Sequence, residues 1–132
     1  MTDLTEMVEW LRSEIEGDRD AAVKAGAKSW TAKRLDRDDL FDAPFTAIYT
    51  NDYPWREVAR SGVVMEGDHI VRHDPRDTIA RCEAELKLID GMAKVIGGEY
   101  IDDGELPLAQ WVLGELISGY RHRPGWKEGW AP

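Results

Sequence analysis

The sequence has few of the features that mark secreted or membrane-embedded proteins. Its 132 residues include one cysteine, Cys82, so no disulfide can form within the chain, and this favours a reducing compartment. No apolar run approaches the ~20 residues that a helix needs to cross a bilayer. The opening, MTDLTEMVEW, carries acids where a secretory signal peptide carries Lys or Arg. We therefore expect a cytoplasmic protein with no membrane partner.

Positive charge is also scarce. There are 17 Lys and Arg residues against 26 Asp and Glu residues, and the formal net charge at pH 7 is −9. Sequence-independent binding of DNA or RNA relies on Lys and Arg side chains that neutralise phosphates, so the composition disfavours a nucleic-acid partner. The acids are dispersed along the chain, which predicts a solvated acidic surface that favours solubility.

Known catalytic motifs are missing as well. The sequence has no Ser-His-Asp or Cys-His signature, no glycine-rich phosphate loop and no zinc-finger spacing. Cys82 falls on the apolar face of a predicted helix, where a buried thiol behaves as a small hydrophobic side chain and is a poor nucleophile. These absences favour a protein that is not an enzyme and that uses no cofactor.

The hydrophobic pattern predicts an α+β fold that is mainly α-helical, in a single domain over residues 1–132. Three segments repeat apolar residues every three or four positions, which predicts helices over about 3–25, 75–96 and 107–120. Asp74 suits the N-cap of the second helix, and Pro75 suits its first position.

Residues 27–66 lack a helical period. Two short runs rich in β-favouring residues, FTAIYT and SGVVM, are separated by turn-forming residues and prolines. We therefore expect a small antiparallel β ribbon between the first two helices. The run WREVARSG, Trp55 to Gly62, stays compatible with a short helical turn.

Six tryptophans are many for a chain of this length, and two of them lie in the C-terminal tail RHRPGWKEGWAP. This composition forms no regular element, so we expect the tail either to fold back and bury its rings or to use them on a partner. Tyr and Trp dominate binding hot spots. We therefore take Tyr120, Trp126 and Trp130 as candidate partner-binding residues.

The segment GDHIVRHDPRDTIARCEAE, Gly67 to Glu85, is a candidate ligand site with three interpretations. In the first, His69 and His73 bind a metal ion together with the carboxylate of Glu83. Pro75 weakens this interpretation, because it pushes the preceding residue out of helical geometry and disturbs the four-residue spacing of the histidines.

In the second interpretation, the start of the helix after Asp74 binds a phosphate or a nucleotide, through Arg72, His73, Asp74 and Arg76. A helix N-terminus offers free N–H groups and partial positive charge, but a carboxylate in the same place repels an anion. In the third, which we favour, Asp74 caps the helix and the histidines form ordinary hydrogen bonds.

The same stretch, HIVRHDPRDTIARCEAELKLID, resembles the pattern H-I-x-R-H-D-P-x-x-x-[IVL]-x-x-x-E-A-[KE]-x-x-[IL] of a family of small proteins of unknown function from actinobacteria and their phages. The ending PGWKEGW resembles that family's HPGYREEW type of tail. The positions that match are His69, Arg72, His73, Asp74, Pro75, Glu83, Pro124, Gly125, Trp126 and Trp130.

The chain also departs from the family pattern. Arg123 stands where the family has a histidine, and Cys82 and Leu86-Lys87 replace a more basic stretch. If the tail histidine were a metal ligand, this chain would lack it. The resemblance implies an actinobacterial or phage origin, and it implies no established activity.

These observations favour a small acidic cytoplasmic interaction protein, phage-encoded if the resemblance holds, that binds a host or other partner protein and has no catalytic activity. A homo-oligomer is also compatible with the sequence. The alternative is a nucleotide- or phosphate-binding protein, or a metal-dependent hydrolase, centred on the HIVRHDPR segment.

Overall fold

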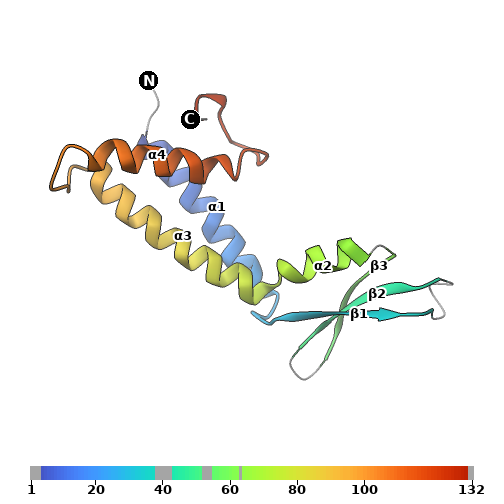
Figure 1. The fold of residues 1–132 in the computed structure, drawn as a ribbon. Coiled ribbons are helices and arrows are strands. Elements are labelled where there is room, and N and C mark those ends of the chain that lie inside the picture. Colours follow the sequence, from blue (N-terminus) through green and yellow to red (C-terminus); the bar gives the residue numbers. More distant parts are fainter. Residues whose placement is uncertain (1–3, 38–42, 52–54, 63, 131–132) are drawn as a thin grey trace. The chain divides into compact units, whose positions relative to one another are not determined.

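The computed structural model describes residues 4–37, 43–51, 55–62 and 64–130 (Figure 1). Their elements follow in the order α1 (Leu4–Lys24), β1 (Trp30–Leu35), β2 (Phe45–Thr50), β3 (Glu57–Ser61), α2 (Val64–Arg72), α3 (Pro75–Ile96), α4 (Glu105–Ser118) and the 3₁₀ turn η1 (Glu128–Trp130). The predicted α+β class, mainly helical, is confirmed. None of the described helices is both long and apolar enough to cross a membrane.

The chain divides into two compact units. The first combines the described parts of Met1–Gly17 and Cys82–Pro132, and the second is Asp18–Arg81. Both divisions fall inside helices, because α1 runs on past Gly17 and α3 runs on past Arg81. The single domain expected over residues 1–132 stays a prediction.

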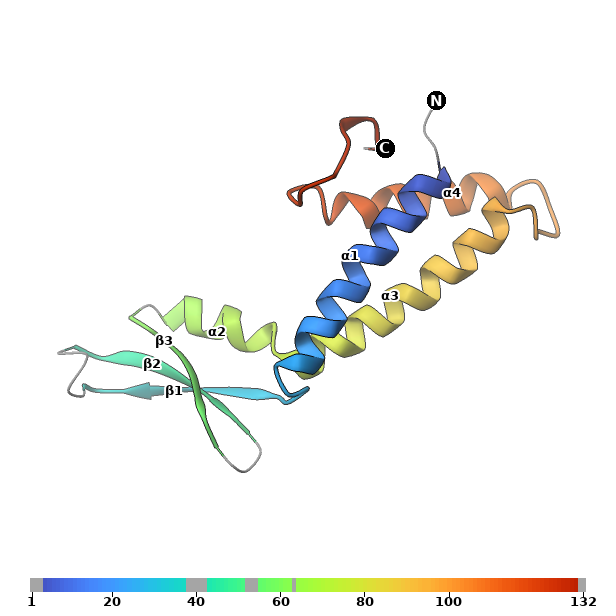
Figure 2. The ribbon, with the colours of Figure 1, turned by 180° about the vertical axis from the view of Figure 1, so that it is seen from behind.

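The first unit is built from helices. Figures 1 and 2 show α4 lying across the first turns of α1 and the last turns of α3. Its core takes side chains from all three helices and from the tail: Met7, Val8, Leu11, Ile15, Cys82, Ile89, Met92, Ala109, Leu113, Ile117, Tyr120 and Trp130. The spacing of these residues is the helical period that the sequence shows. Cys82 is fully buried, as predicted.

The second unit contains a three-stranded antiparallel sheet in the order β1-β2-β3. An antiparallel sheet is therefore confirmed, and the run FTAIYT forms its central strand, β2. The prediction of three helices with a ribbon between the first two differs in detail, because helix α2 also lies between α1 and α3. β2 pairs with β1 from Trp30 opposite Thr50 to Leu35 opposite Phe45. The edge strand β3 pairs Ser61 with Thr46.

One alternative that the sequence left open for this unit, and one expectation, are wrong. Trp55 to Gly62 does not form a helical turn, because Glu57–Ser61 forms hydrogen bonds to β2 as strand β3. The run SGVVM does not form one strand: Ser61 is the last residue of β3, α2 begins at Val64, and Val63 lies outside the described residues. The hydroxyl of Ser61 donates to the carboxylate of Glu66 at 2.7 Å, which ties the end of the strand to the first turn of the helix.

Helix α2 contacts all three strands of the sheet. The contact is closest at Gly67, which is buried: a Cβ atom on this residue would lie 2.6 Å from Cγ2 of Thr46. Only a residue without a side chain therefore allows α2 to lie this close to β2.

Candidate functional site

The HIVRHDPR segment forms the junction between α2 and α3. Asp74 is 2% exposed, and its Oδ1 accepts a hydrogen bond of 2.8 Å from the backbone N–H of Asp77. Its backbone carbonyl accepts the N–H of Thr78 at 2.9 Å, which is the first hydrogen bond of α3. The predicted N-cap is thus confirmed, and Pro75 stands at the first helical position, where its missing N–H costs nothing.

The second oxygen of Asp74 has a different partner. Oδ2 accepts a hydrogen bond of 3.0 Å from the backbone N–H of Trp30, the first residue of β1. Close by, the N–H of Arg76 donates to the carbonyl of Lys28 at 3.2 Å. Both carboxylate oxygens are therefore used within the protein, so Asp74 acts in the architecture of the second unit.

His69 and His73 lie next to each other at this junction. Their ring centroids are 4.4 Å apart with an angle of 42° between the rings, and both side chains are exposed. Nδ1–H of His73 donates to the carbonyl of His69 at 2.9 Å. Among the described residues, no three His, Cys, Asp or Glu side chains lie close enough to hold a metal ion, so Glu83 does not complete a site with this pair.

The two arginines of the segment are exposed as well. Nε of Arg76 lies 3.5 Å from Oδ1 of Asp77 in a surface ion pair, which is worth at most about 1 kcal/mol. Arg72 is the last residue of α2. The structure thus places Arg72, His73 and Arg76 on the surface, whereas the fourth predicted ligand residue, Asp74, is buried and engaged.

The C-terminal tail folds back on the first unit. Tyr120 and Trp130 are buried in its core, and Trp126 packs against that core. The rings of Trp10 and Trp130 lie 5.1 Å apart with a tilt of 51°, an arrangement that aromatic pairs favour. Of the two alternatives for the tail, the structure shows burial of the rings. Partner binding through Tyr120, Trp126 and Trp130 stays a prediction.

Polar contacts hold the tail in place. The hydroxyl of Tyr120 donates to the carboxylate of Glu85 at 2.6 Å. Arg123, which stands where the family pattern has a histidine, forms an ion pair of 3.1 Å with Glu14. A further ion pair joins Lys127 to Glu6. Two basic residues of the tail, Arg123 and Lys127, thus bind acids on α1.

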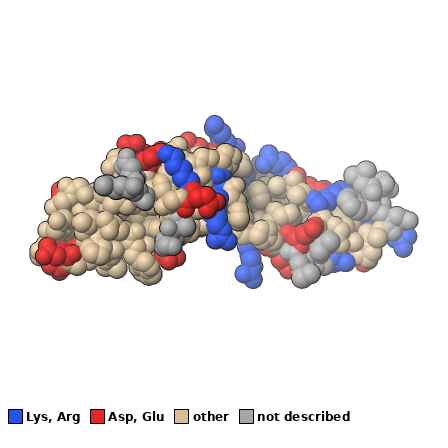
Figure 3. Space-filling view, turned by 90° about the horizontal axis from the view of Figure 1, so that it is seen from above, with Lys and Arg blue, Asp and Glu red and all other residues tan. Residues whose placement is uncertain are grey.

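An apolar groove of about 340 Å³ lies between α3 and α4 in the first unit. Leu88 and Leu108 line this groove and are 54% and 58% exposed, and Trp111, elsewhere on α4, is 59% exposed. Figure 3, seen from the side of α4, shows few charged side chains over this helix, which contains Glu105 and Glu115 as its charged residues. We call Leu88, Leu108, Trp111 and the groove the α3–α4 surface.

The sequence analysis missed this surface, although α4 carries a signal for it. Helix α4 has apolar residues on every side, in the run LPLAQWVLGELI. One unit buries one face of such a helix, here through Ala109, Leu113 and Ile117, so the opposite face stays exposed unless something else covers it.

A model of a family of unknown function (DUF6221) matches residues 4–132. The chain belongs to this family. The match to DUF6221 runs from the start of α1 to the tail, and it therefore includes both segments on which the resemblance rests. No curated protein and no solved structure matches the chain. An actinobacterial or phage origin stays a prediction.

Proposed function

We propose that this protein is a cytoplasmic protein-binding module without catalytic activity, and that the α3–α4 surface of its first unit contacts the partner. A single exposed leucine is ordinary on a protein surface. Here Leu88 and Leu108 line one groove, and Trp111 is exposed on the same helix as Leu108. Exposed apolar groups that gather in this way mark interaction sites.

The α3–α4 surface offers an anchor, Trp111, and its groove offers a space to fill. Trp111 is of the residue type most enriched among binding hot spots. Gly91 lines the groove from α3, and a Cβ atom built on it would meet nothing within 4 Å. The lack of a side chain at Gly91 keeps this part of the groove open.

The occupant that fits best is a basic amphipathic helix of a partner protein. A groove between two helices accepts the apolar face of a third helix. The first unit has 14 Asp and Glu residues against six Lys and Arg, so it attracts a basic partner. A second copy of the chain carries the same excess of acid and is repelled, which argues against a homo-oligomer through this surface.

The predicted alternative, a phosphate-binding or hydrolytic site at the HIVRHDPR segment, has less support. It requires Asp74 to be available to a ligand, but both oxygens of that carboxylate accept backbone hydrogen bonds. If the chain is encoded by a phage, as the resemblance implies, the partner helix belongs to a host protein.

The test uses a synthetic Leu/Lys amphipathic peptide and a scrambled peptide of equal composition. We expect the amphipathic peptide to bind in fluorescence anisotropy, and Gly91→Gln to weaken binding about tenfold, because its side chain fills the groove. Gly91→Ala is the matched control. It should keep the affinity while it raises stability by up to about 1 kcal/mol, because alanine favours a helix. Equal binding of both peptides, or no effect of Gly91→Gln, would contradict the proposal.

A further inference from the structure

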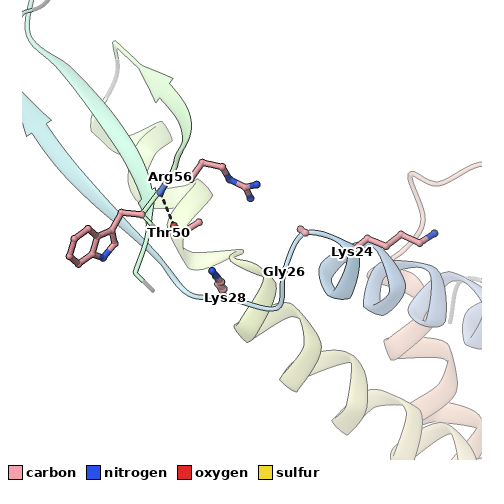
Figure 4. Close-up of a pocket in the computed structure, with 7 residues that line it drawn as sticks. Lys24, Gly26, Lys28, Thr50 and Arg56 are labelled. Carbon is pink, nitrogen blue, oxygen red and sulfur yellow. Dashed lines mark hydrogen bonds between the residues drawn. The ribbon is translucent and has the colours of Figure 1, made fainter. Parts of the chain in front are cut away.

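The second unit contains a cavity of about 440 Å³ where α1 ends next to the sheet (Figure 4). Lys24, Lys28, Thr50, Trp55 and Arg56 line it, together with small residues at the end of α1. No segment that the sequence analysis marked as a candidate site includes these residues. The cavity is independent of the α3–α4 surface, because it belongs to the other unit.

The charge of the lining is unusual for this protein. Among the described residues, the lining contains three cations and no acid, although the chain as a whole carries a net charge of −9. None of Lys24, Lys28 and Arg56 forms an ion pair with a described residue, whereas Arg60 on the same sheet pairs with Glu57. Unpaired cations that gather at a cavity create a positive potential and attract anions.

Hydrogen bonds hold the backbone at one of these cations, Arg56. Thr50 and Arg56 exchange two hydrogen bonds, both of 2.9 Å: the N–H of Arg56 donates to Oγ1 of Thr50, and the N–H of Thr50 donates to the carbonyl of Arg56. Gly26, with φ of +102°, turns the chain out of α1 and toward Lys28. Figure 4 shows Lys28 and Arg56 beside the Thr50–Arg56 hydrogen bond, with Lys24 projecting farther out along α1.

An aromatic ring completes the lining. Trp55 is 71% exposed, and its Nε1–H donates to the carbonyl of Asn51 at 3.0 Å, which restrains the indole. An exposed indole next to cations offers a stacking surface to a heterocyclic base whose phosphate is neutralised nearby. The volume lies in the range of small-molecule sites.

We infer that this cavity binds a mononucleotide, with the phosphate at Lys28 and Arg56 and the base against Trp55. A long polyanion such as RNA fits less well, because the many acids of the chain repel it. A sugar phosphate shares the phosphate chemistry but has no base, so the two kinds of ligand can be told apart.

The experiment compares AMP, ribose 5-phosphate and adenosine by isothermal titration calorimetry at low salt. We expect AMP to bind most tightly, at least about fivefold more tightly than ribose 5-phosphate, because base stacking contributes about 1–3 kcal/mol. Adenosine, which lacks the phosphate, should bind at least about tenfold more weakly than AMP. No binding of AMP at millimolar concentration, or equal affinities for AMP and ribose 5-phosphate, would overturn the inference.

Variants locate the site. Arg56→Gln and Lys28→Gln should each weaken AMP binding about tenfold, because each removes a charge-assisted contact to phosphate. Lys33→Gln is the matched control: it removes the same charge from an exposed position on β1 outside the cavity, and it should change the affinity less than about twofold. Equal losses in all three variants would show a general electrostatic effect and overturn the inference. If Arg56→Gln does not fold, by circular dichroism, Lys28→Gln decides alone.

Discussion

The carboxylate of Asp74 accepts a hydrogen bond of 3.0 Å from the backbone N–H of Trp30, a residue 44 positions earlier in the chain. The same carboxylate caps α3 through the N–H of Asp77. One buried side chain therefore fixes the start of a long helix and the start of the first strand together. This explains why an acid stands at this position without any need for a ligand.

The first prediction concerns this double role. Asp74→Ala should lower the free energy of unfolding by about 2–4 kcal/mol, because it removes a helix cap and leaves a partly buried N–H without a partner. Asp74→Asn should cost less, since its one remaining side-chain oxygen can still accept one of the two bonds. Urea unfolding followed by circular dichroism measures both changes. Asp68→Ala, at an exposed position on α2, is the control, and an equal loss there would refute the role of Asp74.

The second prediction concerns the docked tail. Gly125 has φ of +90°, and a Cβ atom on it would lie 2.7 Å from Nε1 of Trp10. Gly125→Ala should therefore destabilise the first unit by about 2–4 kcal/mol, through backbone strain and overlap with the indole. The measurement is the urea midpoint followed by tryptophan fluorescence.

Gly129→Ala is the matched control for this prediction. A Cβ atom at Gly129 would meet nothing within 4 Å, so the expected change is at most about 0.5 kcal/mol. If Gly125→Ala proves as mild as Gly129→Ala, the tail does not pack against Trp10 as described.

The third prediction concerns the contact between α2 and β2. Gly67→Ala should destabilise the second unit by about 1–3 kcal/mol, because the new methyl group overlaps Cγ2 of Thr46. Thr46→Ser removes that atom, so the double variant should be more stable than the sum of the single changes implies. A double-mutant cycle from thermal unfolding measures this coupling. Strict additivity of the two changes would show that the residues do not touch.

The fold was predictable where local signals and packing agree. The pair Asp74-Pro75 marks the start of α3 by local backbone chemistry alone, and the three- and four-residue spacing in the long helices reports the faces that they bury. Helix α2 escaped prediction because its first residues, Val64 and Met65, continue an apolar run that reads as a strand. What specifies α2 is its packing on the sheet at Gly67, a long-range contact that no local pattern shows.

The two proposed sites also differ in how far the sequence predicts them. Helix α4 has apolar residues on more faces than one unit can bury, so its sequence alone predicts an exposed apolar surface such as the α3–α4 surface. The cation-lined cavity joins residues from the end of α1, from the loop after it, from the end of β2 and from the two positions just before β3. Strand pairing brings them together, and no spacing in the sequence reveals it.

The continuity of α1 and α3 through both units has a consequence for how the protein can be divided. Asp18–Arg81 lies between the two segments of the first unit, and each point of division falls within a ladder of helical hydrogen bonds. No excision at a linker can release either unit, because any cut at these points removes turns that the other unit needs. Duplication, exchange or loss of half of this protein in evolution would therefore have to rebuild two helices at once.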